Sequence, residues 1–362
     1  MSSSQTFTFS AERFFPRRIY DLISDVRATD PVAAYKATQT RQPRKELAPD
    51  GKLLVLAADD PARGVTASAG GDMALTIRYD YLARIVRVLL GGVFDGVIGT
   101  PDVLEDLCLV QQVLRENSGP AFLDGKVFIG SMNRGGLLGS TFEMADTFTA
   151  FNVERAKHIR CDGVKMLLRI DPDSPDTARA LERCARVITD VNHAQMIALI
   201  DCQPVKRTGE RTWETLLDPD EWARAVGIAA ALGETSTRTW LTVPRFEGMR
   251  RATEAATLPF LLTDANSPPD VTRLLADVSA AIGEARNIRG VAMGRNVLCP
   301  GTDDPLAVAG AIEAVVRRRI DPETILGRID QARGRKMDAL TSLLADKELV
   351  FEGGVQAAGY AT

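Results

Sequence analysis

Short apolar runs alternate with amphipathic stretches along the chain from residue 53 onward. Apolar runs of this length are typical of buried parallel strands, and the stretches between them carry apolar residues at helical spacing. The predicted strands cover residues 53–58, 94–98, 126–130, 162–170, 195–201, 239–243, 259–263 and 289–293. The predicted helices lie near 76–90, 102–117, 141–158, 270–284 and 305–317, with one more beginning near Pro175 and one containing Trp222 after a long connection over 203–217.

Eight strands that alternate with helices over about 265 residues are typical of a (β/α)8 barrel. A doubly wound open sheet is the alternative, but it usually has fewer units and a glycine-rich first turn. No G-x-G-x-x-G motif follows the first predicted strand. The sequence therefore predicts a TIM barrel over residues 51–320. We expect an N-terminal helical extension and linker over 1–50, with a helix at 19–36, and a C-terminal helix and tail over 321–362.

Composition and charge narrow the classes of function. The 362 residues are 45% hydrophobic and 25% charged, which is ordinary for a globular protein. A formal net charge of −4 provides no overall positive field for nucleic acid. No apolar run is long enough to span a membrane, and His158 and His193 lack a second ligand at metal spacing. We therefore expect neither nucleic-acid nor membrane partners, and neither a metal nor another cofactor.

Five cysteines without C-x-x-C spacing, and a start that does not resemble a signal peptide, favour reduced thiols in a cytoplasmic protein. We expect the terminal extensions to cover the barrel or to mediate self-association, so a homo-oligomer is predicted.

Lys165 lies inside the predicted strand over 162–170. Strand alternation places Lys165 and Arg169 on one face and only apolar residues on the other, so the polar face suits the barrel lumen. A lysine desolvated there would lose part of its proton affinity and could form a Schiff base with a carbonyl substrate. The alternative is structural: Lys165 and Arg169 would form an ion-pair layer with Asp59 and Asp201.

Polar residues at the predicted strand ends are the candidates for the site, because TIM barrels hold their active sites at the C-terminal ends of the strands. They are Asp59, Asp60, Asn133, Arg134, Lys165, Arg169, Asp201, Arg245, Asp264, Gly294 and Arg295. The set combines acids with an amine and arginines, as proton transfer beside an anionic substrate requires. After the last strand, backbone N–H groups near Gly294 could approach a phosphate that Arg295 also binds, although the same residues could form a simple turn.

Three segments, 53–64, 162–171 and 290–296, resemble in order and spacing the class I aldolases of the DhnA and tagatose-bisphosphate aldolase group. Within that group they are similar to the Cgl0159-like, deoxyribose-phosphate-aldolase-like barrel proteins associated with inositol and sugar catabolism. The resemblance covers most of residues 50–320. It implies a (β/α)8 barrel, Schiff-base chemistry without a metal, and a phosphorylated ketose or dihydroxyacetone phosphate as substrate or product.

The resemblance also implies roles for individual residues. Asp59 would handle protons or a substrate hydroxyl, and Asp201 would serve in general acid/base catalysis. Lys165 resembles the lysine on the family's fourth strand. Gly294 and Arg295 resemble the family's phosphate-binding turn after the eighth strand. From their strand-end positions, and not from the resemblance, Asp60, Arg169, Arg245 and Asp264 are also expected to bind the substrate or its phosphate.

The sequence departs from this family at one position. The family places its Schiff-base lysine on the sixth strand, shortly before a Val-Pro pair, where this chain has Trp240 or Thr242 depending on register. Neither side chain can form an imine. Three hypotheses follow: Lys165 acts as the nucleophile of a carbon–carbon lyase or transaldolase-like enzyme; the pocket runs acid/base isomerisation or lyase chemistry; or the barrel binds sugar phosphates without catalysis.

Overall fold

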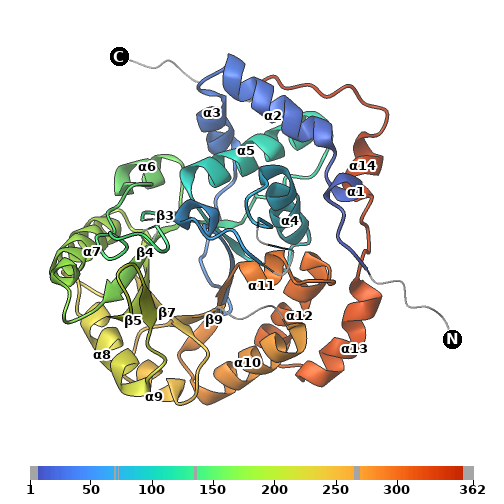
Figure 1. Ribbon diagram of the computed structural model, residues 1–362. Coiled ribbons are helices and arrows are strands. Elements are labelled where there is room, and N and C mark those ends of the chain that lie inside the picture. The colour runs from blue at the N-terminus through green and yellow to red at the C-terminus, as the bar shows by residue number, and fades with distance from the viewer. Residues whose placement is uncertain (1–6, 69–70, 72, 134–136, 265–269, 354–362) are drawn as a thin grey trace.

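A computed structural model describes residues 7–68, 71, 73–133, 137–264 and 270–353. Eight parallel strands close into a barrel inside a ring of helices, which confirms the predicted (β/α)8 fold (Figure 1). The strands are β1 (Leu53–Ala58), β2 (Gly96–Gly99), β3 (Val127–Ser131), β4 (Gly163–Ile170), β5 (Ile197–Arg207), β7 (Thr239–Pro244), β8 (Phe260–Thr263) and β9 (Ile288–Met293). Pairing of β9 with β1 completes the ring of strands.

The helices follow the strands as the apolar spacing predicts. They are α4 (Arg78–Leu90), α5 (Pro101–Glu116), α6 (Val153–His158), α7 (Pro175–His193), α8 (Pro219–Ala230), α9 (Met249–Thr253), α10 (Val271–Glu284), α11 (Arg295–Leu298) and α12 (Pro305–Arg318). Helices α7, α8 and α12 each begin with proline after a Ser or Asp whose side chain accepts a backbone N–H, a combination that favours a defined start. Among the described residues, no helix is both long and apolar enough to cross a membrane.

Two apolar cores separate the inside of the barrel from its outside. The smaller core fills the lumen and consists of Leu53, Val55, Ile98, Val127, Ile129, Ile197, Leu199, Leu261 and Ala292. The larger core lies between strands and helices and includes Met166 and Leu168 of β4. Lys165 is the register partner of the lumen residue Leu199. The alternation of β4 therefore turns Lys165 into the lumen, as predicted from the sequence.

Two connections differ from the prediction. The expected helix at 141–158 is confined to α6, because Asn152 accepts the backbone N–H of Arg155 and so fixes the helix start there. Residues 203–217 are not a plain loop: β5 continues to Arg207 and pairs with β6 (Trp213–Thr215) as an antiparallel hairpin. Asp201 consequently lies within a long strand and not at its end.

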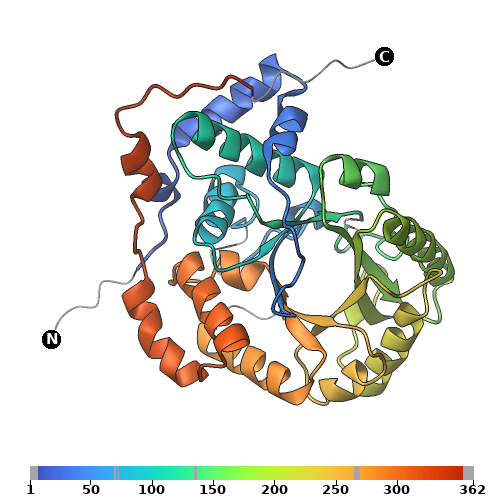
Figure 2. The ribbon, with the colours of Figure 1, turned by 180° about the vertical axis from the view of Figure 1, so that it is seen from behind.

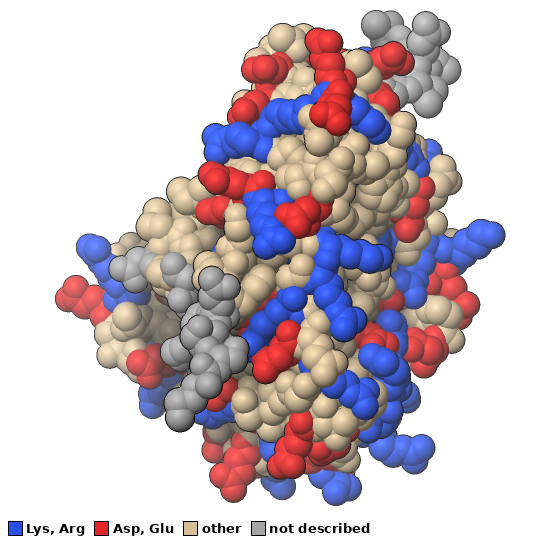
Figure 3. Space-filling model, turned by 90° about the vertical axis from the view of Figure 1, so that its right-hand side faces the viewer, with Lys and Arg blue, Asp and Glu red and all other residues tan. Residues whose placement is uncertain are grey.

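The terminal extensions pack beside each other on the barrel (Figure 1). They form α1 (Ala11–Phe14), α2 (Arg17–Thr29), α3 (Ala33–Thr40), α13 (Pro322–Ala332) and α14 (Ala339–Leu344). The single helix expected at 19–36 is divided, since Pro31 disfavours helical geometry at Asp30. Arg13 of α1 pairs with Asp338 before α14, which joins the two ends of the chain. On the face drawn in Figure 3, side chains of both charges are interspersed.

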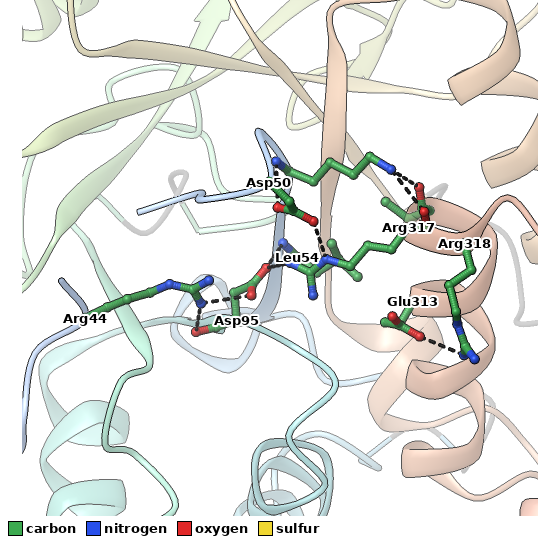
Figure 4. Close-up of polar contacts among 9 residues, drawn as sticks. Arg44, Asp50, Leu54, Asp95, Glu313, Arg317 and Arg318 are labelled. Carbon is green, nitrogen blue, oxygen red and sulfur yellow. Dashed lines mark hydrogen bonds and ion pairs between the residues drawn. The ribbon is translucent and has the colours of Figure 1, made fainter. Parts of the chain in front are cut away.

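Asp95, just before β2, joins three segments at the N-terminal end of the barrel. One oxygen accepts from Arg44 at 2.8 Å, and the other accepts from Leu54 N at 2.8 Å and Arg317 at 2.7 Å (Figure 4). The segment before β1 crosses this face (Figure 2), and its Leu47 packs against the lumen core. The N-terminal end is thus closed by apolar packing and paired charges.

Candidate functional site

Lys165 and Asp59 meet at the C-terminal end of the lumen. Lys165 Nζ lies 2.9 Å from Asp59 Oδ2, and Ser131 Oγ donates to the same oxygen at 2.9 Å. The three residues come from β4, the end of β1 and the end of β3. The side chains of Lys165 and Asp59 are only 12% and 6% exposed, so the pair is shielded from bulk water.

The acids around Lys165 decide its protonation state. Burial lowers the pKa of Lys165, but the charges of Asp59 and Asp201 together outweigh burial, and the pKa lies above its usual value. Burial raises the pKa of Asp59, but pairing with Lys165 lowers it by more, so the pKa lies below its usual value. The resting pair is therefore ionic. This corrects the expectation that desolvation would reduce the proton affinity of Lys165, because nearby opposite charges can exceed the desolvation effect.

Asp201 is held in the lumen by two donors. Its Oδ1 accepts from Thr242 Oγ1 at 2.9 Å and from Gln203 Nε2 at 3.1 Å. Thr242 lies on β7, the sixth strand of the barrel, while Trp240 of the same strand packs against the apolar lumen core. Of the two residues considered for the missing lysine, Thr242 is thus the one that touches a candidate catalytic acid.

Arg169 of β4 contacts the loop that follows β3, and Asn133 at the start of that loop bonds to the backbone of β4. Arg169 pairs with Glu143 at 2.9 Å and donates to the Glu143 carbonyl at 3.2 Å. Asn133 Oδ1 accepts from Leu167 N at 2.8 Å, and its Nδ2 donates to Leu167 O at 2.7 Å. Arg169 thus has Glu143 as a partner that the hypothesis of a layer with Asp59 and Asp201 did not include. The sequence did not reveal Glu143, because it lies in a segment predicted as helix.

The turn after β9 binds a carboxylate of the chain itself. Gly294 N donates to both oxygens of Asp264, at 3.0 and 3.1 Å, and Asn296 N donates at 2.9 Å. Arg295 Nε lies 3.2 Å from Asp60 Oδ2. A Cβ at position 294 would lie 2.3 Å from the Ala57 carbonyl oxygen, so close packing against β1 requires glycine there. The N–H groups that the sequence offered to a phosphate contact Asp264 in this structure.

Acids at this corner have raised pKa values. Burial raises the pKa of Asp264 to about 6, and the charge of Asp60 adds to the effect against the backbone donors. Burial also raises the pKa of Asp60, although Arg295 opposes it. Beside them, the Tyr81 hydroxyl is buried and has no hydrogen-bond partner among the described residues. Sequence analysis missed Tyr81, since it reads as one more apolar position of a helix.

Two candidates from the strand ends remain, Arg245 and Arg134. Arg245 pairs with Glu284 of α10 at 3.0 Å. Arg134 lies outside the described residues. All five cysteines are buried and free. Within the part of the chain that the structure describes, no group of three or more His, Cys, Asp or Glu residues could hold a metal ion.

Comparisons with known proteins show a match to one protein family and to a solved structure. A family model described as Cgl0159-like matches residues 51–316. The solved structure of Cgl0159 from Corynebacterium glutamicum is 32% identical with a TM-score of 0.76, and the match covers 87% of this chain and 100% of that one. No match was found among curated proteins.

More distant solved structures share the fold. A Schiff-base-forming fructose-1,6-bisphosphate aldolase is 18% identical with a TM-score of 0.54, over 78% of this chain and 99% of that one. A fructose-bisphosphate aldolase from Slackia heliotrinireducens is 17% identical with a TM-score of 0.59, over 85% and 92%. At these identities the likeness concerns the barrel architecture.

Proposed function

The chain belongs to the Cgl0159-like family, and from this premise we propose that it is a class I aldolase-like carbon–carbon lyase or transaldolase-like enzyme. Its substrate is a phosphorylated or similarly anionic sugar of carbohydrate or inositol catabolism. The observation that carries the proposal is the buried Lys165–Asp59 pair at the C-terminal end of the barrel, where enzymes of this fold hold their active sites. The occurrence of the same fold in a Schiff-base-forming aldolase supports it.

Asp59 is the group that would release the lysine for attack. Lys165 must lose a proton to become a nucleophile, and Asp59 Oδ2 lies 2.9 Å from Nζ. Binding of a substrate over the pair excludes water, which disfavours the two separate charges and favours the neutral amine and acid. The amine then adds to the substrate carbonyl carbon, and the former carbonyl oxygen leaves as water to give the protonated imine.

Asp201 would serve the bond-breaking step. As the carbon–carbon bond breaks, its electron pair moves into the protonated imine to form an enamine, and the substrate hydroxyl loses its proton to Asp201. Thr242 and Gln203 orient the accepting carboxylate through their hydrogen bonds. The proton that Asp59 received from Lys165 returns when water leaves and gives the protonated imine its charge, and the proton on Asp201 is the one that protonates the enamine. Hydrolysis of the resulting imine then returns the free lysine.

The test is the intact mass of the protein after borohydride reduction with dihydroxyacetone phosphate and a panel of sugar phosphates. We expect a mass increase that maps to Lys165 and is absent in Lys165→Met. Folded protein that gives no adduct with any member of the panel, or an adduct on another lysine alone, would contradict Schiff-base catalysis by Lys165.

The ionic state of Lys165 favours a second candidate function. An ammonium group that pairs with Asp59 and is stabilised by the charge of Asp201 can polarise a carbonyl while the two acids move protons, which would give isomerase or lyase chemistry without an imine. This candidate predicts turnover without a trapped adduct. A barrel that only binds sugar phosphates would instead show thermal stabilisation by the ligand and no substrate consumed.

A further inference from the structure

The cations around the mouth of the barrel differ in how they are paired. Arg169 contacts Glu143, Arg245 contacts Glu284, and Arg295 contacts Asp60. The backbone donors after β9 contact Asp264. The groups with which a sugar phosphate would most simply be bound thus already have acidic partners.

Arg63 is the exception. Within the described residues its guanidinium forms no ion pair, and its Nε is buried without a hydrogen-bond partner. An arginine nitrogen removed from water without an acceptor is costly, and such a group is stabilised when a ligand supplies the acceptor. Asp59 and Asp60 lie near enough for the Arg63 charge to lower their pKa values, yet neither forms an ion pair with it, so the guanidinium can bind an oxyanion from a ligand.

The backbone of Arg63 is held next to the end of β1. It is the last residue of the 3₁₀ turn η1 (Pro61–Arg63), four residues after Asp59, and its carbonyl accepts Leu138 N from the loop after β3 at 3.1 Å. η1 thus lies between the end of β1 and that loop. After burial and their mutual pairing, Asp59 and Lys165 both have Arg63 among the charges that act on their pKa values. The charge of the guanidinium is therefore felt by both members of the pair.

We propose that Arg63 binds the oxyanion of the substrate, a phosphate or a carboxylate, on the β1 side of the barrel mouth. The planar guanidinium can donate two parallel hydrogen bonds to either group. A substrate held in this way directs its neutral part, with the carbonyl, toward Lys165. The inference rests on the proposed function for the ligand class, an anionic sugar, but its binding step does not require an imine.

The test uses three ligands that share a three-carbon skeleton and have no aldehyde or ketone with which Lys165 could react: glycerol 3-phosphate, D-glycerate and glycerol. Isothermal titration of the full chain measures the dissociation constant for each. We expect an anionic ligand to bind more tightly than glycerol, and the preferred anion shows whether the site takes phosphate or carboxylate. Arg63→Gln is expected to weaken that anion about ten- to a hundredfold, as for the loss of a charge-assisted hydrogen bond.

Two further variants sharpen the result. Arg63→Lys keeps the charge without the planar fork and should recover part of the affinity. Arg186→Gln removes one exposed arginine that pairs with Glu182 on α7, far from the barrel mouth, and should leave binding unchanged.

Three outcomes would overturn the proposal: no preference of the native protein for either anion over glycerol, full anion affinity in Arg63→Gln, or an equal loss in Arg186→Gln. Affinity that depends on Arg63 while borohydride trapping fails would remove Schiff-base catalysis and leave the anion site standing.

Discussion

Two lysines at opposite ends of the same barrel show how neighbours set the state of a buried amine. Lys126, before β3 at the N-terminal end, donates to the Phe94 carbonyl, and burial lowers its pKa to about 8 although Asp95 opposes the shift. Lys165, at the C-terminal end, is buried as well, yet Asp59 and Asp201 hold its pKa above the usual value. Burial alone therefore does not identify a nucleophile.

The two ends also differ in how their charges are satisfied. At the N-terminal end, the carboxylate of Asp95 accepts from Arg44, Arg317 and the backbone of Leu54, so both of its oxygens have donors (Figure 4). At the C-terminal end, Arg63 has no acidic partner among the described residues, and the pKa of Asp264 is raised. The paired charges around Asp95 stabilise the fold. The unpaired Arg63 and the buried acid Asp264 each cost free energy, and a bound ligand can reduce that cost.

The largest effect is expected for Lys165→Met. If Lys165 is the nucleophile, turnover of the substrate found by trapping should fall roughly a thousandfold or more, as for loss of other nucleophiles. The matched control is Lys126→Met, which removes a lysine with a lowered pKa at the other end and should leave turnover and trapping unchanged. Full activity in Lys165→Met, with its mass and folded state verified, would end the proposal.

Asp95→Ala should produce the next largest change, in stability and not in activity. The substitution leaves Arg44 and Arg317 without their common anion, and loss of one partner from a buried ion pair typically costs about 3–5 kcal/mol of the free energy of unfolding. Asp50 also pairs with Arg317, but it is 44% exposed, so Asp50→Ala should cost less than about 1 kcal/mol. Urea unfolding compares the two variants. Equal losses would show that the network is not organised around Asp95.

Much of this architecture was predictable because it follows from periodicity. The eight apolar runs gave the barrel, and alternation along β4 placed Lys165 in the lumen. Partners contributed by loops were not predictable. Glu143 engages Arg169 from a segment whose composition suggested helix, and Asp264 occupies the turn expected to bind phosphate. Side-chain partners of this kind depend on loop conformation, which has no sequence period.

The sign of the Lys165 pKa shift was missed for a related physical reason. Strand alternation shows that a lysine is buried, but the net effect depends on the distance to acids on other strands. Asp59 approaches Lys165 across the barrel mouth, from a position 106 residues earlier in the chain. Only the closed barrel brings the two groups to within 2.9 Å.

Asp264→Asn tests whether the C-terminal end carries an electrostatic cost. The pKa of Asp264 in the folded chain is about 6, above its usual value of 3.8. The protonated acid therefore stabilises the fold below about pH 4, and this contribution is lost as the pH rises through about 6. Asparagine keeps an acceptor for Gly294 N but cannot ionise. The variant should gain about 1–3 kcal/mol relative to the native chain between pH 4 and 7. Thermal or urea unfolding across this range measures the gain, and a difference that does not vary with pH would contradict the assignment.

The smallest effect concerns two buried threonines on β7 whose hydroxyls differ in what they contact. Thr242 Oγ1 donates to Asp201 at 2.9 Å, whereas the Thr239 hydroxyl is buried without a partner among the described residues. Thr242→Val removes one of the two side-chain donors to Asp201 and leaves Gln203. The variant should lower kcat about three- to tenfold, which is the range expected for one hydrogen bond, and should change KM less. Thr239→Val removes an unsatisfied hydroxyl and should leave kcat unchanged while stability stays equal or rises. Equal kinetic effects of the two substitutions would show that Thr242 acts through packing of the strand, and the role of Asp201 as an oriented base would lose its support.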